Sequence, residues 1–169
     1  MDCKYKLPSR LPNDLQSLLH YWQNRQTQLG HLPSWADVNL MDLYAIAPRI
    51  FVADRTEKRS GSIRYRWRYW GTKLTTFVGA DLTGKYLDDT HDSAANEAAF
   101  GHYEWVLQTR RPHYFNNHVS VIGARTPHWS YERLIVPLEG KTVRSGHILG
   151  VYVSEDERRL SNPDEKSVY

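Results

Sequence analysis

Residues 61–71, Gly-Ser-Ile-Arg-Tyr-Arg-Trp-Arg-Tyr-Trp-Gly, alternate aromatic and basic side chains more regularly than any other segment of this chain. A β-strand directs successive side chains to opposite faces. The rings of Tyr65, Trp67 and Tyr69 are therefore predicted on one face of a strand, and the arginines between them on the other. A strand with these two faces fits either a sheet that encloses a ligand or one that binds nucleic acid.

The length and composition of the chain fit one globular domain. It has 169 residues, of which 40% are hydrophobic and 24% are charged, enough to bury a single core. The net charge of +3 is the balance of 22 basic and 19 acidic residues. Nucleic-acid binding would therefore need a local basic patch, because the surface as a whole is not strongly cationic.

Cysteine content and hydropathy indicate the compartment. Cys3 is the only cysteine, which excludes an internal disulfide and a thiolate-rich zinc site and is compatible with a reducing cytosol. No apolar run approaches the roughly 18 residues of a membrane span. The first eight residues also lack the apolar region of a signal peptide. We therefore expect a cytoplasmic protein with no membrane partner.

An amphipathic helix is predicted within residues 1–31. Leu15, Leu18, Leu19 and Trp22 recur at helical spacing and form its apolar stripe. The stripe has two interpretations, packing on the protein's own sheet or contact with another chain. Since no effector segment is recognised, we expect output through association and predict the stripe as the homodimer or partner surface. Leu19→Asp is then expected to change the oligomer mass with little loss of fold.

The remaining segments predict an antiparallel sheet with inserted helices. Helices are expected at 72–78, near 85–89 and at 93–110, after short helical turns between 34 and 47. Strands are expected at 49–54, 63–70, 114–122, 129–138 and 147–153. This order predicts an α+β fold, a five-stranded antiparallel sheet with helices on one face and an N-terminal helix. The predicted organisation is a helix at 1–31, a domain at 32–153 and a flexible polar tail at 154–169.

Three motifs, in this order, carry a resemblance to a known family. They are Trp-Arg-Tyr-Trp-Gly-Thr at 67–72, Gly-Ala-Asp-Leu-Thr-Gly at 79–84 and Tyr-Glu-Arg-Leu-Ile-Val-Pro-Leu at 131–138. Together they resemble the short bacterial PAS-like family, over about 32–153. The resemblance implies a PAS fold and a stand-alone sensory or regulatory module that binds a small molecule or a protein partner and signals by association. Trp67 and Trp70 are bulkier than the aliphatic residues expected there, which leaves less room in a cavity or lines it with rings.

The resemblance turns the aromatic face of the 63–70 strand towards the helices. The candidate ligand pocket is lined by rings from that strand, the helices and the later strands: Tyr65, Trp67, Tyr69, Phe77, Phe100, Tyr103, Trp129 and Tyr131. Apolar walls with a few polar groups suit a small flat ligand. The same rings also fit a core packed solid with aromatic side chains, and both interpretations stay open. No particular cofactor is predicted.

The alternative function is binding of single-stranded nucleic acid by the strand of arginines and rings. Such binding needs bases stacked on rings and phosphates held by cations on one face. Strict alternation separates the rings from the arginines. A nucleic-acid partner is therefore disfavoured.

No catalytic or metal centre is predicted. Gly79 and Gly84 have the spacing of a phosphate-binding loop, but Tyr86 stands where Ser or Thr would bind magnesium. A tight turn is predicted there instead, with positive φ at both glycines and local bonds from Asp81 and Thr83. Acidic residues beside His91 lack an established metal-ligand spacing, and His102 is expected at the edge of a helix stripe. Since no nucleophile arrangement stands out, we expect a protein that is not an enzyme.

Overall fold

Five strands form one antiparallel sheet in the computed structural model, which describes residues 6–90, 93–120, 128–142 and 145–154. The strands are β1 (Ile50–Glu57), β2 (Ile63–Trp70), β3 (His113–Ser120), β4 (His128–Glu139) and β5 (Gly146–Ser154). Their order across the sheet is β2-β1-β5-β4-β3. The hairpin β1–β2 and the meander β3–β4–β5 are thus joined by the pairing of β1 with β5. The predicted five-stranded α+β fold is confirmed.

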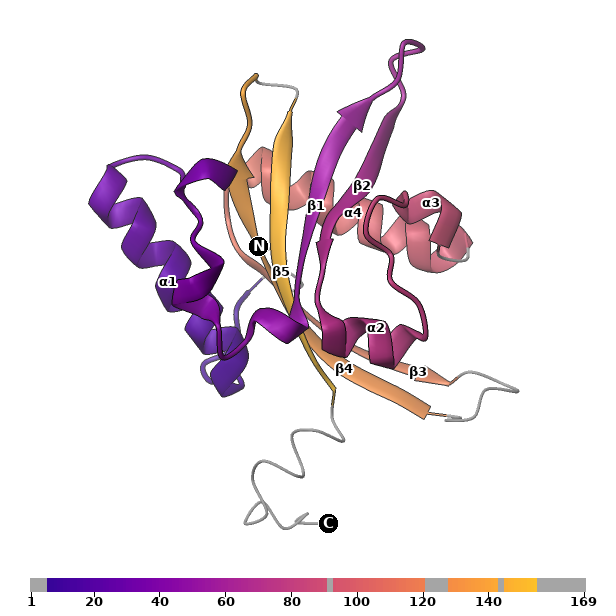
Figure 1. Ribbon diagram of the computed structural model, residues 1–169, viewed down its shortest axis with the longest axis horizontal. Coiled ribbons are helices and arrows are strands. Elements are labelled where there is room, and N and C mark those ends of the chain that lie inside the picture. The colour runs from indigo at the N-terminus through magenta and orange to yellow at the C-terminus, as the bar shows by residue number, and fades with distance from the viewer. Residues whose placement is uncertain (1–5, 91–92, 121–127, 143–144, 155–169) are drawn as a thin grey trace.

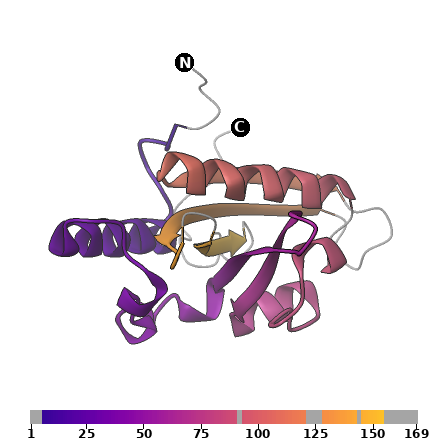
Figure 2. The same cartoon turned by 90° about the horizontal axis from the view of Figure 1, so that it is seen from above.

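Helices cover both faces of the sheet (Figure 1). They are α1 (Asn13–Leu29), α2 (Thr72–Val78), α3 (Leu87–Thr90) and α4 (Ser93–Thr109), with short 3₁₀ helices η2 (Trp35–Asp37), η3 (Leu40–Leu43) and η4 (Ala47–Arg49). Helix α1 packs on one face, and α2 to α4 pack on the opposite face. Figure 2 shows α4 running along the sheet. Among the described residues, no helix combines the length and apolarity needed to span a membrane.

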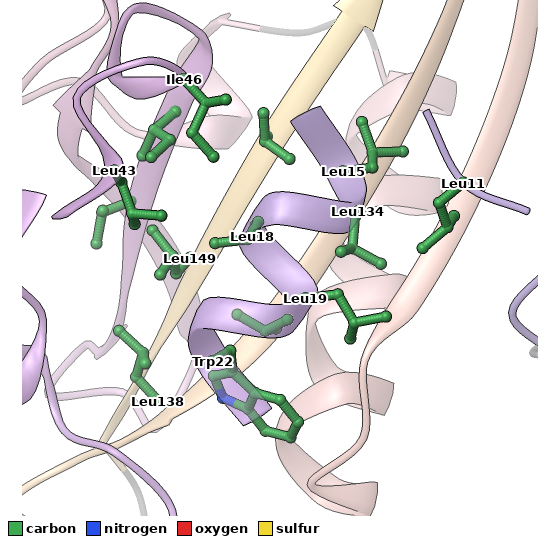
Figure 3. Packing of buried hydrophobic residues seen from close by; sticks show 14 of the residues in the cluster. Leu11, Leu15, Leu18, Leu19, Trp22, Leu43, Ile46, Leu134, Leu138 and Leu149 are labelled. Atoms are coloured by element: carbon green, nitrogen blue, oxygen red, sulfur yellow. The ribbon is translucent and has the colours of Figure 1, made fainter. Parts of the chain in front are cut away.

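The apolar stripe of α1 is buried against the chain's own sheet (Figure 3). All four of its residues lie in a core with side chains of β1, β4 and β5: Leu15, Leu18, Leu19 and Trp22. The indole Nε1 of Trp22 also donates a hydrogen bond to the Pro137 carbonyl at 2.8 Å. The prediction that this stripe is an exposed interaction surface is wrong, because these apolar side chains face the sheet rather than solvent.

A β-bulge breaks the alternation predicted for β2. Consecutive residues of β1 pair with Trp67 and Tyr69, so Arg68 is one extra residue on β2. Beyond the bulge the faces exchange. Trp70 joins the buried cluster of Tyr65 and Trp67, whereas Tyr69 packs against the core on the α1 side. The predicted placement of Tyr69 beside Tyr65 and Trp67 is therefore wrong, since one inserted residue reverses the side-chain direction.

The turn at 79–84 has the predicted geometry and covers the edge of the sheet. Gly79 has φ of 84° and Gly84 has φ of 83°, both in the left-handed region that favours glycine. The Thr83 N–H donates to Asp81 Oδ1 at 2.9 Å, which closes the turn. The Gly84 N–H then donates to the Trp67 carbonyl at 2.8 Å, so the turn shields an edge strand from further pairing.

Candidate functional site

A half-open cleft lies between α2 and the ends of β4 and β5. Its volume is about 390 Å³, within the range of small-molecule sites. Its lining comes from η4, α2, β4 and β5, and consists of Arg49, Lys73, Leu74, Thr76, Phe77, Tyr131, Tyr152 and Ser154. The cleft therefore joins segments that are distant in sequence and meet only in the folded chain.

Cations and rings line this cleft together. Among its described lining residues, Arg49 and Lys73 are basic and none is acidic. Tyr131 and Tyr152 form an edge-on pair with ring centroids 5.1 Å apart. Phe77 lies one helical turn after Lys73 on α2, so the two side chains share a face. The lining thus combines aromatic walls with a few charged and polar groups.

Arg49 connects the cleft to the N-terminal helix. Its Nη1 lies 3.1 Å from Asp14 Oδ2, and Asp14 is in the first turn of α1. The ion pair holds the guanidinium in place at the cleft.

The interior beside the cleft is filled with aromatic rings. The Phe51 ring lies 5.4 Å from Trp67, 6.2 Å from Tyr103 and 5.1 Å from Tyr152, measured between centroids. Trp67 and Trp70 are in edge-on contact at 4.9 Å. These two large side chains fill the space beside Phe51. The rings between β1, β2 and α4 therefore form a filled aromatic core rather than a cavity.

A buried cation, Arg133, lies behind the tyrosines of the cleft and is only 2% exposed. Its Nη2 donates to His102 Nδ1 at 2.8 Å, which requires that Nδ1 carry no proton. The rings of Tyr103, Phe115 and Tyr152 lie 5.3 to 5.8 Å from the guanidinium carbon. Burial acts to lower the pKa of Arg133, but the tyrosines around it raise the pKa above its ordinary value, so the charge is retained.

Glu104 on α4 ties that helix to the hairpin. It accepts hydrogen bonds from the Tyr65 hydroxyl at 2.5 Å and from Arg55 Nε at 2.8 Å, both at Oε1. Arg55 Nη2 donates to Oε2 at 3.1 Å. Burial acts to raise the pKa of Glu104, but the bonds from Arg55 and Tyr65 outweigh it and lower the pKa below its ordinary value.

The lowered pKa of Glu104 predicts an acid-sensitive contribution to stability. A carboxylate whose pKa is depressed by folding stabilises the fold above its unfolded pKa, and that contribution is lost as pH falls through the folded pKa. We therefore expect wild type to exceed Glu104→Gln in free energy of unfolding at about pH 6, and the difference to shrink towards about pH 3. Urea denaturation of both proteins across this range measures the difference. A difference independent of pH would contradict the role given to the ionised Glu104.

The arginines of β2 are bound to acceptors of this chain. Each makes a hydrogen bond through its Nε: Arg64 to Asp88, Arg66 to the Gly84 carbonyl, and Arg68 to Asp54. Tyr65 and Trp67 are buried on the face towards α4. The strand thus does not combine exposed rings and cations on one face, and its geometry does not support the nucleic-acid alternative.

The predicted pocket residues are divided among several places. Phe77 and Tyr131 line the cleft. Trp67 and Tyr103 belong to the filled core, and Tyr69 lies on the opposite face of the sheet. The side chain of Trp129 falls outside the described residues.

A second cleft contains two further residues of the predicted pocket. Tyr65 and Phe100 line this space of about 340 Å³ between β2, α3 and α4. Its lining also includes the ion-paired Arg64 and Asp88. Glu97 adds a second acidic side chain to this lining, so the cleft does not share the charge character of the first one.

Several residues of the site were missed from sequence, although signals for them exist. Tyr152 and Arg133 follow from strand alternation, because they lie on the same faces of β5 and β4 as the buried Ile148 and Ile135. Lys73 follows from its spacing of four residues before Phe77. Arg49 has no such signal.

The histidines show no metal site in the described part of the chain. No group of three or more His, Cys, Asp or Glu residues there has the arrangement to hold a metal ion. His91 and the side chains of His118 and His128 lie outside the described residues. His102, expected at the edge of a stripe, is buried and stacks on His113 with ring centroids 4.4 Å apart.

Comparison with known protein families finds one that matches most of the chain. A family profile described as PAS domain matches residues 11–153, so the matched region includes α1. No match was found among curated proteins. One similar solved structure is the PAS domain of Bordetella pertussis BvgS, at 18% identity and a TM-score of 0.42, covering 69% of this chain and 82% of that chain. Another is an RNA-binding light-oxygen-voltage receptor, at 14% identity and a TM-score of 0.36, covering 70% of this chain and 36% of that chain.

Proposed function

This chain belongs to the PAS domain family of sensory and regulatory modules, and we propose that it binds a small molecule in the cleft between α2 and the ends of β4 and β5. The bound molecule then alters the association of this protein with another protein chain. The observation that carries the proposal is the lining of the cleft, where two cations and three rings surround a volume of about 390 Å³. Concave sites with apolar walls and a few polar groups are typical of ligand binding.

We further propose that the cleft binds its ligand without transforming it. The described lining residues include no carboxylate, imidazole or thiol. These are the groups that most often act as general bases or nucleophiles at neutral pH. The proposed activity is therefore recognition.

Native mass spectrometry of freshly purified protein tests the ligand and the association together. We expect the wild-type chain to carry an additional small mass that denaturation releases. Thr76→Trp should abolish or strongly reduce that mass, because Thr76 is exposed and lines the cleft. A tryptophan there occupies the space that the ligand needs.

Val78→Trp is the matched control. Val78 lies on the same helix, is 42% exposed and does not line the cleft. This variant should retain the ligand mass of the wild type. A Thr76→Trp protein that retained the same mass would locate the ligand elsewhere, and a wild-type protein with only the bare chain mass would contradict a tightly held ligand.

A further inference from the structure

We propose that the interior of this protein binds a small monovalent oxyanion at Arg133 and Tyr103. Arg133 comes from β4 and Tyr103 from α4, and the guanidinium carbon lies 5.6 Å from the centre of the Tyr103 ring. Neither residue is among the described lining residues of the cleft, so this inference does not rest on the proposed function. A buried charge and two buried donors carry it.

The positive charge of Arg133 is buried without an acidic partner among the described residues. Its Nη2 donates to His102, and the groups that raise its pKa are tyrosines. A buried charge is costly unless it is paired, and buried charges in proteins normally have a counter-ion. A single negative charge beside the guanidinium removes this cost, which favours a monovalent anion.

Two buried polar atoms beside this charge have no hydrogen-bond partner in the described part of the chain. They are Nε of Arg133 and the hydroxyl oxygen of Tyr103. Burial raises the pKa of Tyr103 well above its ordinary value, so its hydroxyl keeps the proton and can donate. Buried donors without an acceptor are rare in folded proteins. An oxyanion supplies an oxygen acceptor to both groups.

Aromatic rings enclose the guanidinium of Arg133 without stacking closely on it. Three rings, from α4, β3 and β5, have centres 5.3 to 5.8 Å from its carbon. By comparison, the ring of Tyr86 lies 3.9 Å from the guanidinium carbon of Arg64. The enclosure favours an anion of few atoms, and a planar oxyanion matches the planar guanidinium.

The bound anion joins α4 to the sheet. Its two donors come from α4 and β4, where Arg133 Nη2 already donates to His102 Nδ1 at 2.8 Å. Arg133 is also the cross-strand partner of Tyr152, which lines the cleft. The anion site thus lies directly behind a wall of the cleft, which gives the anion a short path from solvent.

A nitrate titration of the ¹⁵N-labelled full chain, followed by NMR, tests the inference. Nitrate is a planar monovalent oxyanion, and sodium gluconate, whose anion is too large for the enclosure, keeps the ionic strength constant. We expect the Nε–H signal of Arg133 and the backbone amide signals of His102 and Tyr103 to shift and saturate. Nitrate should also raise the unfolding temperature relative to gluconate, because an anion that binds only the folded chain stabilises it.

Tyr103→Phe removes only the hydroxyl that is proposed to bind the anion. The variant should fold, because that hydroxyl has no partner among the described residues to lose, and it should bind nitrate about tenfold more weakly. Tyr65→Phe is the matched control. Its ring lies 5.0 Å from that of Tyr103, and its hydroxyl donates to Glu104 instead. This variant should bind nitrate as the wild type does.

The outcomes separate this inference from the proposed function. Wild-type signals that do not saturate with nitrate, or that shift equally with gluconate, overturn the anion site. Equal nitrate affinity of wild type and Tyr103→Phe also overturns it, because the anion then binds elsewhere. The proposed function is judged separately, by the mass that the wild type retains and Thr76→Trp loses.

Discussion

Leu19→Asp is expected to lower the free energy of unfolding by about 4 kcal/mol or more, because the substitution places a carboxylate in the core between α1 and the sheet. Leu19 is only 7% exposed, and it lies in the cluster of apolar side chains shown in Figure 3. The change removes buried apolar surface and adds a charge for which this cluster has no polar partner. Urea denaturation followed by far-ultraviolet circular dichroism measures the loss.

Gln23→Asp is the matched control for that experiment. Gln23 lies on the solvent side of the same helix, so the same acidic residue there should change stability by less than about 0.5 kcal/mol. If Leu19→Asp instead kept the wild-type stability and changed the oligomer mass, the stripe of α1 would be a contact surface between chains. The two variants thus separate the two interpretations of an apolar helix stripe.

Helical periodicity identified the stripe of α1 but not the surface that covers it. Leu15, Leu18 and Trp22 meet β4 and β5, which lie more than a hundred residues later in the chain. Periodicity is a property of one segment, whereas burial depends on two. The same spacing is also typical of a dimer contact. Only the assembled sheet shows that the stripe packs within its own chain.

Strand alternation predicted the faces of the β2 rings correctly as far as the bulge at Arg68. Tyr65 and Trp67 share the predicted face, and the bulge at Arg68 then transfers Tyr69 to the α1 side. A bulge arises from pairing with a neighbouring strand, so β2 alone does not reveal it. The local motif at 79–84 was more predictable, because positive φ at Gly79 and Gly84 is a property of the turn itself.

The cleft was less predictable than the fold. Ring-bearing residues were the sequence signal, but Trp67 and Tyr103 among them pack into the core, because aromatic burial stabilises the protein without a ligand. The cations that distinguish the cleft, Arg49 and Lys73, come from η4 and α2 and meet the ends of β4 and β5 only after folding. Their role depends on tertiary geometry, which no local pattern records.

Gly71→Ala is expected to cost about 3 kcal/mol, because the position has no room for a Cβ atom. Gly71 is the N-cap of α2 and has φ of −64°, which any residue adopts, so the constraint is steric rather than conformational. A Cβ there would lie 2.2 Å from the Pro48 carbonyl oxygen, and the Gly71 N–H is held by the Ile50 carbonyl at 2.9 Å. Both contacts are with backbone, which cannot rotate away as a side chain can. The same close approach explains why the motif at 67–72 has a glycine at this position. Thermal or urea unfolding of Gly71→Ala measures the loss of stability.

Gly101→Ala makes the same chemical change where the structure predicts the opposite sign. Gly101 is exposed within α4, and a Cβ there would meet no atom within 4 Å. Replacing an interior helical glycine with alanine removes unfolded-state entropy, so the variant should gain about 0.5 to 1 kcal/mol. Similar effects at both positions would contradict the tight contact between α2 and the segment before β1. That contact matters for the site because it holds Arg49 and Lys73 on the same cleft.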